Sequence, residues 1–376
     1  MLAKWQAFLL PVYFFAFVRD RIKKVRMAKK ETPALFGIKN SNRDFSQVDS
    51  WGKNCFNSSF PIALGCYMHS KNIKPVYLYT NKSLAVIHKN IDVRDLYGGD
   101  PLKDNLFFSF ETQYKPYLDY VSSNLEGDDV VIRKGGKDIR CLEVKLTALP
   151  DNSTCDLTED KYSCELVVRP ATIIYLACSI CELYKHKKRE LKLILNKFTT
   201  IKDWNNPSEI LELLIDMKNA INIIMKNNID AQIPLIIEPV WKTKGKSNVL
   251  ADECLDLFVW SSFSLIRLFS SRKVESKVSR QDRTLVWLIK MLLDYSTYGK
   301  FNFKEIIDSI TLNVKNDKAF SSNGRETYPF LKCKELTKPR VKKDEIKNIV
   351  LGGGQNLLSP ERRFDAFVSF NEDLFL

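Results

Sequence analysis

Two acids and a lysine occur at a spacing suited to metal-dependent chemistry within residues 127–147, GDDVVIRKGGKDIRCLEVKLT. Asp129 precedes a short apolar run, and Glu143 and Lys145 follow later in the stretch, two positions apart. Carboxylate oxygens suit Mg²⁺, a hard cation that keeps several of its waters for substrate phosphates. A bound ion lowers the pKa of a water and stabilises charge on phosphoryl oxygens, and the lysine would position that water. The stretch therefore indicates hydrolysis of a phosphate ester.

The sequence around these groups predicts a β-hairpin. An apolar β-branched run leads into the turn residues Gly135-Gly136, and residues 139–146 then alternate between apolar and polar side chains. Because successive side chains of a strand point to opposite faces, Glu143 and Lys145 share one face. The backbone carbonyl of Val144 lies between them and supplies a third oxygen for the ion.

The identity of the aspartate is open at this stage. Asp128 and Asp129 point to opposite faces if both have strand geometry, so only one of them can lie beside Glu143. We favour Asp129, because it directly precedes the apolar run.

An acid and a lysine at this spacing are weak evidence by themselves, because the pair recurs in the chain. Glu143 and Lys145 differ from the other pairs in following an acid-led hairpin, whereas most of the others lie in polar or helix-like surroundings. The other pairs are Glu159/Lys161, Glu190/Lys192, Asp216/Lys218, Glu275/Lys277 and Glu345/Lys347.

Long strings on either side of the hairpin carry a resemblance to a known family. The strings are NSNRDF and WGKN-x-FNSSFP within residues 34–67, EVKLTALPDNSTC and EDKYSCELVVRPATIIYLACSI within 143–180, and LGGGQNLLSPERRFDAF at 351–367. They resemble the HindVP family of type II restriction endonucleases. An Asp followed by Glu-x-Lys on a strand likewise resembles the PD-(D/E)xK nuclease superfamily.

The resemblance implies a Mg²⁺-dependent endonuclease that cuts both strands of double-stranded DNA at a short palindrome. It implies a homodimer, with a cognate DNA methyltransferase as the genetic partner in a restriction-modification system, and a recognition sequence of the GRCGYC type. It also implies that Asp129, Glu143 and Lys145 are catalytic, and that Asp129, Glu143 and the carbonyl of Val144 hold the metal. Two alternatives remain: another nuclease of the superfamily, such as a repair or junction-resolving enzyme, and a non-enzymatic basic DNA-binding protein.

The charge of the chain favours a polyanionic partner such as DNA. The formal net charge is +13, and residues 1–26 hold six Lys or Arg and one Asp, so residues 27–376 keep a net charge of +8. Amide and basic side chains hydrogen-bond to base edges and phosphates. Our candidates for DNA contacts are Asn42, Arg43, Lys53, Arg362 and Arg363.

The expected fold class is α/β, with a restriction-endonuclease-like central mixed sheet, helices on both of its faces and helical insertions. Residues 27–376 would form a single endonuclease domain, with the PD-(D/E)xK core at about 105–200 and a helical, DNA-binding elaboration at about 200–376. Apolar periodicity predicts helices over 111–125 and 207–227 and a buried strand over 233–240. The resemblance to the nuclease superfamily makes Glu111, at the start of the first of these helices, a candidate supporting acid, and a solvated acid that interacts with the helix dipole is the favoured alternative.

Residues 1–26 combine a 14-residue apolar run with a basic cluster that follows it. The run is short for a membrane span, and the order of charge and apolar run is the reverse of a signal peptide. We expect a mis-called upstream start or a loose extension, with a weak membrane anchor as the alternative and no stable membrane association.

Nine scattered cysteines indicate reduced thiols in a cytoplasmic protein. Cys178 and Cys181 form a single CxxC in a helical stretch, and the chain has three histidines. A zinc site is therefore the less favoured reading.

Overall fold

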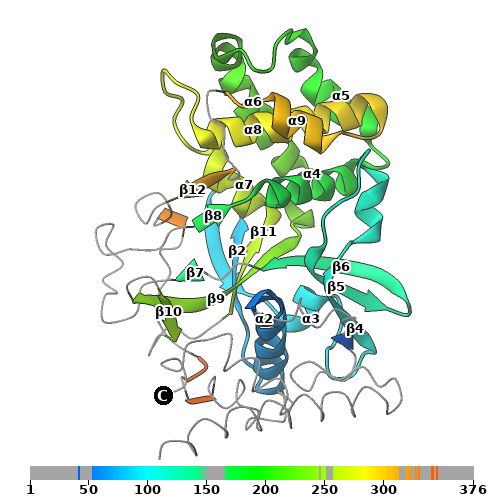
Figure 1. Cartoon of the computed structure of the whole chain (residues 1–376), viewed down its shortest axis with the longest axis vertical. Coiled ribbons are helices and arrows are strands. Elements are labelled where there is room, and N and C mark those ends of the chain that lie inside the picture. Colours follow the sequence, from blue (N-terminus) through cyan, green and yellow to red (C-terminus); the bar gives the residue numbers. More distant parts are fainter. Residues whose placement is uncertain are drawn as a thin grey trace, which may run out of the picture. The chain divides into compact units, whose positions relative to one another are not determined.

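A computed structural model of the chain describes residues 41–42, 53–144, 147–148, 166–244, 247–250, 257–312 and 319–322, with short pieces between 327 and 345 (Figure 1). All of them belong to one compact unit, Ala34–Leu376. The predictions for residues 1–26 concern residues outside this description. Among the helices described, none is both long enough and apolar enough to cross a membrane.

A mixed sheet of ten strands runs through the described residues, in the order β1-β4-β5-β6-β9-β11-β2-β3, with β7 and β10 also pairing with β9. Strand β5 is antiparallel to both of its neighbours, β4 and β6, whereas β6 pairs with β9 in parallel, as β11 does with β2. The mixed α/β architecture is thereby confirmed. The strands are β1 Ser41–Asn42, β2 Val76–Thr80, β3 Val86–Asn90, β4 Leu106–Thr112, β5 Asp128–Lys134, β6 Lys137–Val144, β7 Thr147–Ala148, β9 Pro234–Lys244, β10 Ser247–Leu250 and β11 Leu257–Ser261.

Helices flank this sheet, as expected. Helix α2 packs against strands β4, β5, β6, β9 and β11, while α8 packs against α4, α5, α6, α7 and α9. A small second sheet pairs β8 Leu166–Val168 with β12 Phe320–Ser322. The helices are α2 Lys53–Ser70, α3 Val93–Tyr97, α4 Pro170–Tyr184, α5 Lys188–Leu195, α6 Pro207–Asn227, α7 Ser262–Ser270, α8 Arg280–Tyr298 and α9 Phe303–Ser309, and the 3₁₀ turns are η2 Lys115–Asp119, η3 Asn196–Thr200 and η4 Ile229–Ala231.

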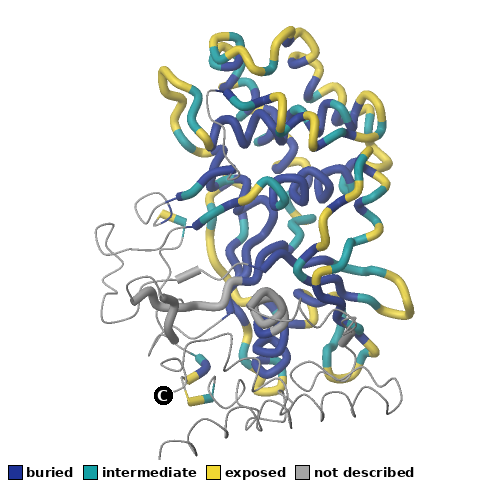
Figure 2. The backbone as a smooth tube through the Cα atoms, viewed as in Figure 1, coloured by how far each residue is buried: buried dark blue, intermediate teal, exposed yellow. Residues whose placement is uncertain are grey.

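The core joins the central strands to helices α4 and α8. Figure 2 shows the buried backbone continuing from β5, β6 and β11 into these helices. Every residue of β11 is buried, which is the pattern of a strand covered on both faces. The hairpin strands β5 and β6 therefore form part of the packed core.

The predicted hairpin is confirmed as β5 and β6. Gly135 and Gly136 make the turn with φ of 58° and 76°, in the left-handed region that glycine adopts without steric cost. Positive φ at both turn positions is the geometry that matches the twist of paired strands. The predicted helix 207–227 and strand 233–240 are also confirmed, as α6 and β9.

The helix predicted over 111–125 is wrong. Glu111 belongs to the end of β4, where it has a φ of 52°, and only the 3₁₀ turn η2 follows. Lys115 precedes Pro116, and a residue before proline disfavours the α conformation. Glu111 is therefore not a helix-borne acid.

Candidate active site

The register of the hairpin, continued past its last pair, predicts that Asp129 and Glu143 lie close together. Val130 pairs with Leu142 and Val131 with Cys141, and continuing this register by one residue places Asp129 opposite Glu143. Directly opposed residues of an antiparallel pair project from the same face of the sheet. The local pattern of two alternating runs around a glycine turn therefore supports the expectation that these acids face each other.

Asp129 is fixed against the neighbouring strand. The backbone amide of Val144 donates a hydrogen bond of 2.6 Å to Asp129 Oδ2. Asp129 is half-buried, so its carboxylate lies at the border between core and solvent. This is a suitable place for a group that must reach both a cation and a substrate.

Glu143 is held from the other side by helix α4. Its side chain is buried, with the residue 7% exposed, and Thr172 Oγ1 donates a hydrogen bond of 2.9 Å to Glu143 Oε1. Thr172 lies in the first turn of α4, which begins at Pro170. The N-terminal turn of α4 therefore contacts Glu143 of β6.

Asp128 occupies a different environment from Asp129. It is 4% exposed, and its Oδ2 accepts a hydrogen bond of 2.9 Å from the backbone amide of Tyr114. Burial raises the pKa of the Asp128 carboxyl group to about 8, and the nearby charges of Glu143 and Asp129 add to that rise, against the opposing effect of Tyr175 and Tyr114. Asp128 is thus the more buried of the two aspartates, and its carboxyl group lies near those of Glu143 and Asp129.

The remaining predicted site residues are placed only in part. Val144 ends the described part of β6, and Lys145 lies outside the described residues. Asn42 lies in β1, paired with Ser109 of β4, and Lys53 begins α2. Arg43, Arg362 and Arg363 also lie outside the described residues.

The donor set around Asp129 and Glu143 fits a hard divalent cation. Both side chains offer oxygen, and the carbonyl of Val144 is the third candidate ligand. Within the part of the chain that the structure describes, no group of three His, Cys, Asp or Glu side chains is arranged to hold a metal. A site at this hairpin would therefore use two carboxylates, a backbone oxygen and waters, as Mg²⁺ does when it binds substrate phosphates.

Thr172, Tyr175 and Tyr114 were missed by sequence reasoning. Thr172 and Tyr175 are polar residues three positions apart in a helix that is otherwise strongly apolar near its start, PATIIYLACSICELY. That spacing places them on one face of the helix. Two polar residues on one face of an apolar helix are a signal that this face lies against other polar groups. Tyr114 contributes only a backbone amide, for which its residue type gives no signal.

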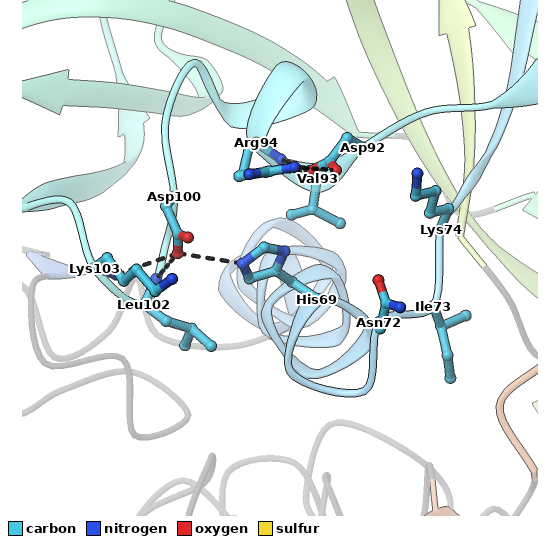
Figure 3. A pocket seen from close by; sticks show the side chains of 10 residues that line it. All are labelled: His69, Asn72, Ile73, Lys74, Asp92, Val93, Arg94, Asp100, Leu102 and Lys103. Atoms are coloured by element: carbon cyan, nitrogen blue, oxygen red, sulfur yellow. Dashed lines mark hydrogen bonds and ion pairs between the residues drawn. The ribbon is translucent and has the colours of Figure 1, made fainter.

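A hollow at the end of α2 is distinct from the acidic pair. Figure 3 shows His69 of α2 directed toward Asp100, with a ring nitrogen 3.2 Å from Asp100 Oδ1. In the same hollow Arg94 forms an ion pair of 2.8 Å with Asp92. None of the hairpin acids lines it, and much of its charge is matched internally. This hollow is therefore separate from the predicted site residues of the hairpin.

Comparison with known proteins identifies the family of the chain. The HindVP restriction endonuclease family model matches residues 51–375. The chain is 42% identical over 349 residues to the type II restriction enzyme HgiDI of Herpetosiphon aurantiacus, covering 91% of this chain and 97% of that protein. It is also 42% identical over 347 residues to the probable type II restriction enzyme HindVP of Haemophilus influenzae, covering 91% and 95%. No solved structure matches. The chain therefore belongs to the HindVP restriction endonuclease family and is a DNA-cleaving hydrolase.

Proposed function

We propose that the chain is a Mg²⁺-dependent type II restriction endonuclease that hydrolyses phosphodiester bonds of double-stranded DNA at a short palindrome. The observation that carries the proposal is the hydrogen bond from the Val144 amide to Asp129, which ties Asp129 to the residue next to Glu143 across the hairpin. Two carboxylates, one buried and one half-buried, offer oxygen ligands for the ion, and Asp129 keeps contact with solvent.

In this proposal Asp129, Glu143 and the carbonyl of Val144 hold Mg²⁺. The ion, when bound, lowers the pKa of a water and stabilises negative charge on the phosphoryl oxygens. Lys145, two positions beyond Glu143, positions the attacking water. The amide of Val144 holds Asp129 in place, and the hydroxyl of Thr172 does the same for Glu143.

The proposal extends to the partners of the enzyme. A palindrome presents the same half-site twice, so we propose a homodimer that places one hairpin at each strand. A cognate DNA methyltransferase would protect the cytoplasmic host DNA, which completes a restriction-modification system, and the proposed recognition sequence is of the GRCGYC type. The names of both relatives and the net charge of +13 support action on DNA. The proposed DNA contacts remain Asn42, Arg43, Lys53, Arg362 and Arg363.

Plasmid cleavage by purified Glu143→Gln and Lys145→Ala variants tests the assignment. We expect both to lose Mg²⁺-dependent cutting while retaining DNA binding in a gel-shift experiment, because neither change removes a proposed DNA contact. Glu212→Gln, an exposed acid on α6, is the matched control and should cut normally. Normal cutting by the Lys145 variant would rule out the proposed site.

The cleavage products separate this function from the alternatives. Discrete bands from a defined plasmid, lost in EDTA and restored by Mg²⁺, identify a restriction enzyme. Smeared or structure-dependent nicking would indicate a repair or junction-resolving nuclease. Binding that weakens steeply with salt, without any Mg²⁺-dependent cutting, would indicate a non-enzymatic DNA-binding protein.

A further inference from the structure

We infer that Thr172 is a positioning residue for Glu143, which fixes one carboxylate oxygen and thereby sets the geometry of the cation site. The inference rests on the proposed function, because it concerns the same two carboxylates. It adds a residue from α4, far from the hairpin in sequence, to the machinery for metal binding.

The Thr172 hydroxyl is well placed to constrain Glu143. Thr172 is fully buried and Glu143 is 7% exposed, so water competes little for the 2.9 Å hydrogen bond between them. An ionised carboxylate only accepts hydrogen bonds, so the hydroxyl proton must point toward Glu143. Charge-assisted bonds of this kind are stronger than neutral ones, and a low local dielectric strengthens them further.

The support for Thr172 is rigid. Helix α4 packs against α7 and α8, and its residues from Thr172 to Cys181 are buried. Tyr175, on the same face of α4, lies near Asp128 of β5 and lowers the pKa of its carboxyl group. The first turns of α4 therefore face acids on both strands of the hairpin.

Positioning a ligand from outside the metal's own coordination sphere has a measurable effect. Hydrogen-bond partners of ligating carboxylates orient them, and losing one such partner costs about 10- to 100-fold in metal affinity or activity. Without the hydroxyl, Glu143 would lose this hydrogen bond, and the orientation of its carboxyl group would be less constrained. The predicted defect therefore lies first in the metal requirement and only secondarily in the rate at saturating metal.

The test uses Thr172→Val, which keeps the shape of the side chain, and Thr172→Ser, which keeps the hydroxyl. Binding of Mn²⁺ to the full chain is followed by electron paramagnetic resonance, and the Mg²⁺ concentration for half-maximal plasmid cleavage is measured in parallel. We expect Thr172→Val to weaken Mn²⁺ binding and to raise the half-saturating Mg²⁺ concentration by about tenfold or more. Thr172→Ser should stay near the wild type in both.

Thr284→Val is the matched control. Thr284 is also fully buried, and its hydroxyl donates a hydrogen bond of 2.9 Å to the carbonyl of Arg280 within α8. This variant should lose stability without a change in metal dependence.

Two results are decisive against the inference. If Thr172→Val loses only stability, as Thr284→Val does, and its Mn²⁺ binding and Mg²⁺ requirement are unchanged, Thr172 has no positioning role. In that case, if the Glu143→Gln variant is inactive, the proposed function still holds although the inference about Thr172 is wrong. If Glu143→Gln itself retains cleavage and Mn²⁺ binding, the proposed function fails first and the inference fails with it.

Discussion

Asp129 and Val144 join the two strands of the hairpin through a 2.6 Å hydrogen bond from the Val144 amide to the Asp129 carboxylate. The backbone pairing of β5 with β6 ends at Val130 and Leu142, so this side chain continues the connection where the ladder stops. The position of the acid therefore depends on the hairpin itself. Changes that move the start of β5 should act on catalysis as well as on stability.

Paired substitutions distinguish the two aspartates. In Asp129→Asn the side-chain amide oxygen still accepts the hydrogen bond from the Val144 amide, but the negative charge is lost. Because a bound cation supplies several kcal/mol of charge stabilisation, we expect the cleavage rate to fall by about a hundredfold or more. In Asp128→Asn the amide oxygen still accepts from the Tyr114 amide, and cleavage should stay within about tenfold of the wild type. Initial rates on plasmid at saturating Mg²⁺ provide the measurement. The opposite ranking of the two variants would assign the cation to Asp128.

A methyl group at Gly127 should disturb the site through the backbone. A Cβ at this position would lie 2.8 Å from the carbonyl oxygen of Glu111, which no side-chain rotation relieves. Strand β4 and the start of β5 must then separate, and Asp128 and Asp129 move with them. We expect Gly127→Ala to lower the free energy of unfolding by about 1–3 kcal/mol, as overpacking does, and to slow cleavage at saturating Mg²⁺. Urea denaturation and plasmid assays check both effects, and unchanged cleavage would show that the acids do not depend on this approach.

The hairpin turn offers a contrasting case, since a Cβ at Gly135 or Gly136 meets nothing within 4 Å. The φ of 76° at Gly136 is nevertheless unfavourable for alanine, so Gly136→Ala should destabilise the protein by about 1–2 kcal/mol. Gly135→Asn should be close to neutral, because asparagine tolerates the first position of such a turn. Both variants should cleave normally below their melting temperatures. Equal stability of Gly136→Ala and the wild type in urea would contradict the prediction.

The hairpin could be predicted from the sequence because everything that specifies it is local. Alternation, the glycine pair and the acid before the apolar run all lie within residues 127–147, and they were enough to predict the strands β5 and β6 and the turn between them. The choice of Asp129 over Asp128 remains a prediction.

The contacts that complete the site come from distant parts of the chain, and no local pattern specifies them. Thr172 reaches Glu143 from a helix, and β6 pairs with β9, whose strand character was predicted but whose partner was not. The helix expected over 111–125 failed for a related reason. Apolar spacing there was real, but Pro116 and the bond from the Tyr114 amide to Asp128 favour a short turn.

Arg283 provides the last prediction, which concerns stability away from the site. It is 1% exposed, stacks on Trp287 with its guanidinium carbon 4.6 Å from the ring centre, and donates hydrogen bonds to the carbonyls of Thr311 and Ala319. Removing it leaves buried carbonyls without these donors and empties a large volume in the core. We expect Arg283→Ala to lower the free energy of unfolding by about 2–4 kcal/mol.

Urea denaturation measures this loss, with Arg189→Ala as the control, because Arg189 is exposed on α5 and its removal should change stability by no more than about 0.5 kcal/mol. Arg283→Lys should be destabilised too, since a single ammonium group cannot replace the planar guanidinium group that donates to two carbonyls. Cleavage by all three variants should persist at low temperature, because Arg283 donates to carbonyls beside α8 and not to the hairpin acids. An Arg283→Ala protein as stable as the wild type would show that the buried arginine is not what holds Thr311 and Ala319 to α8.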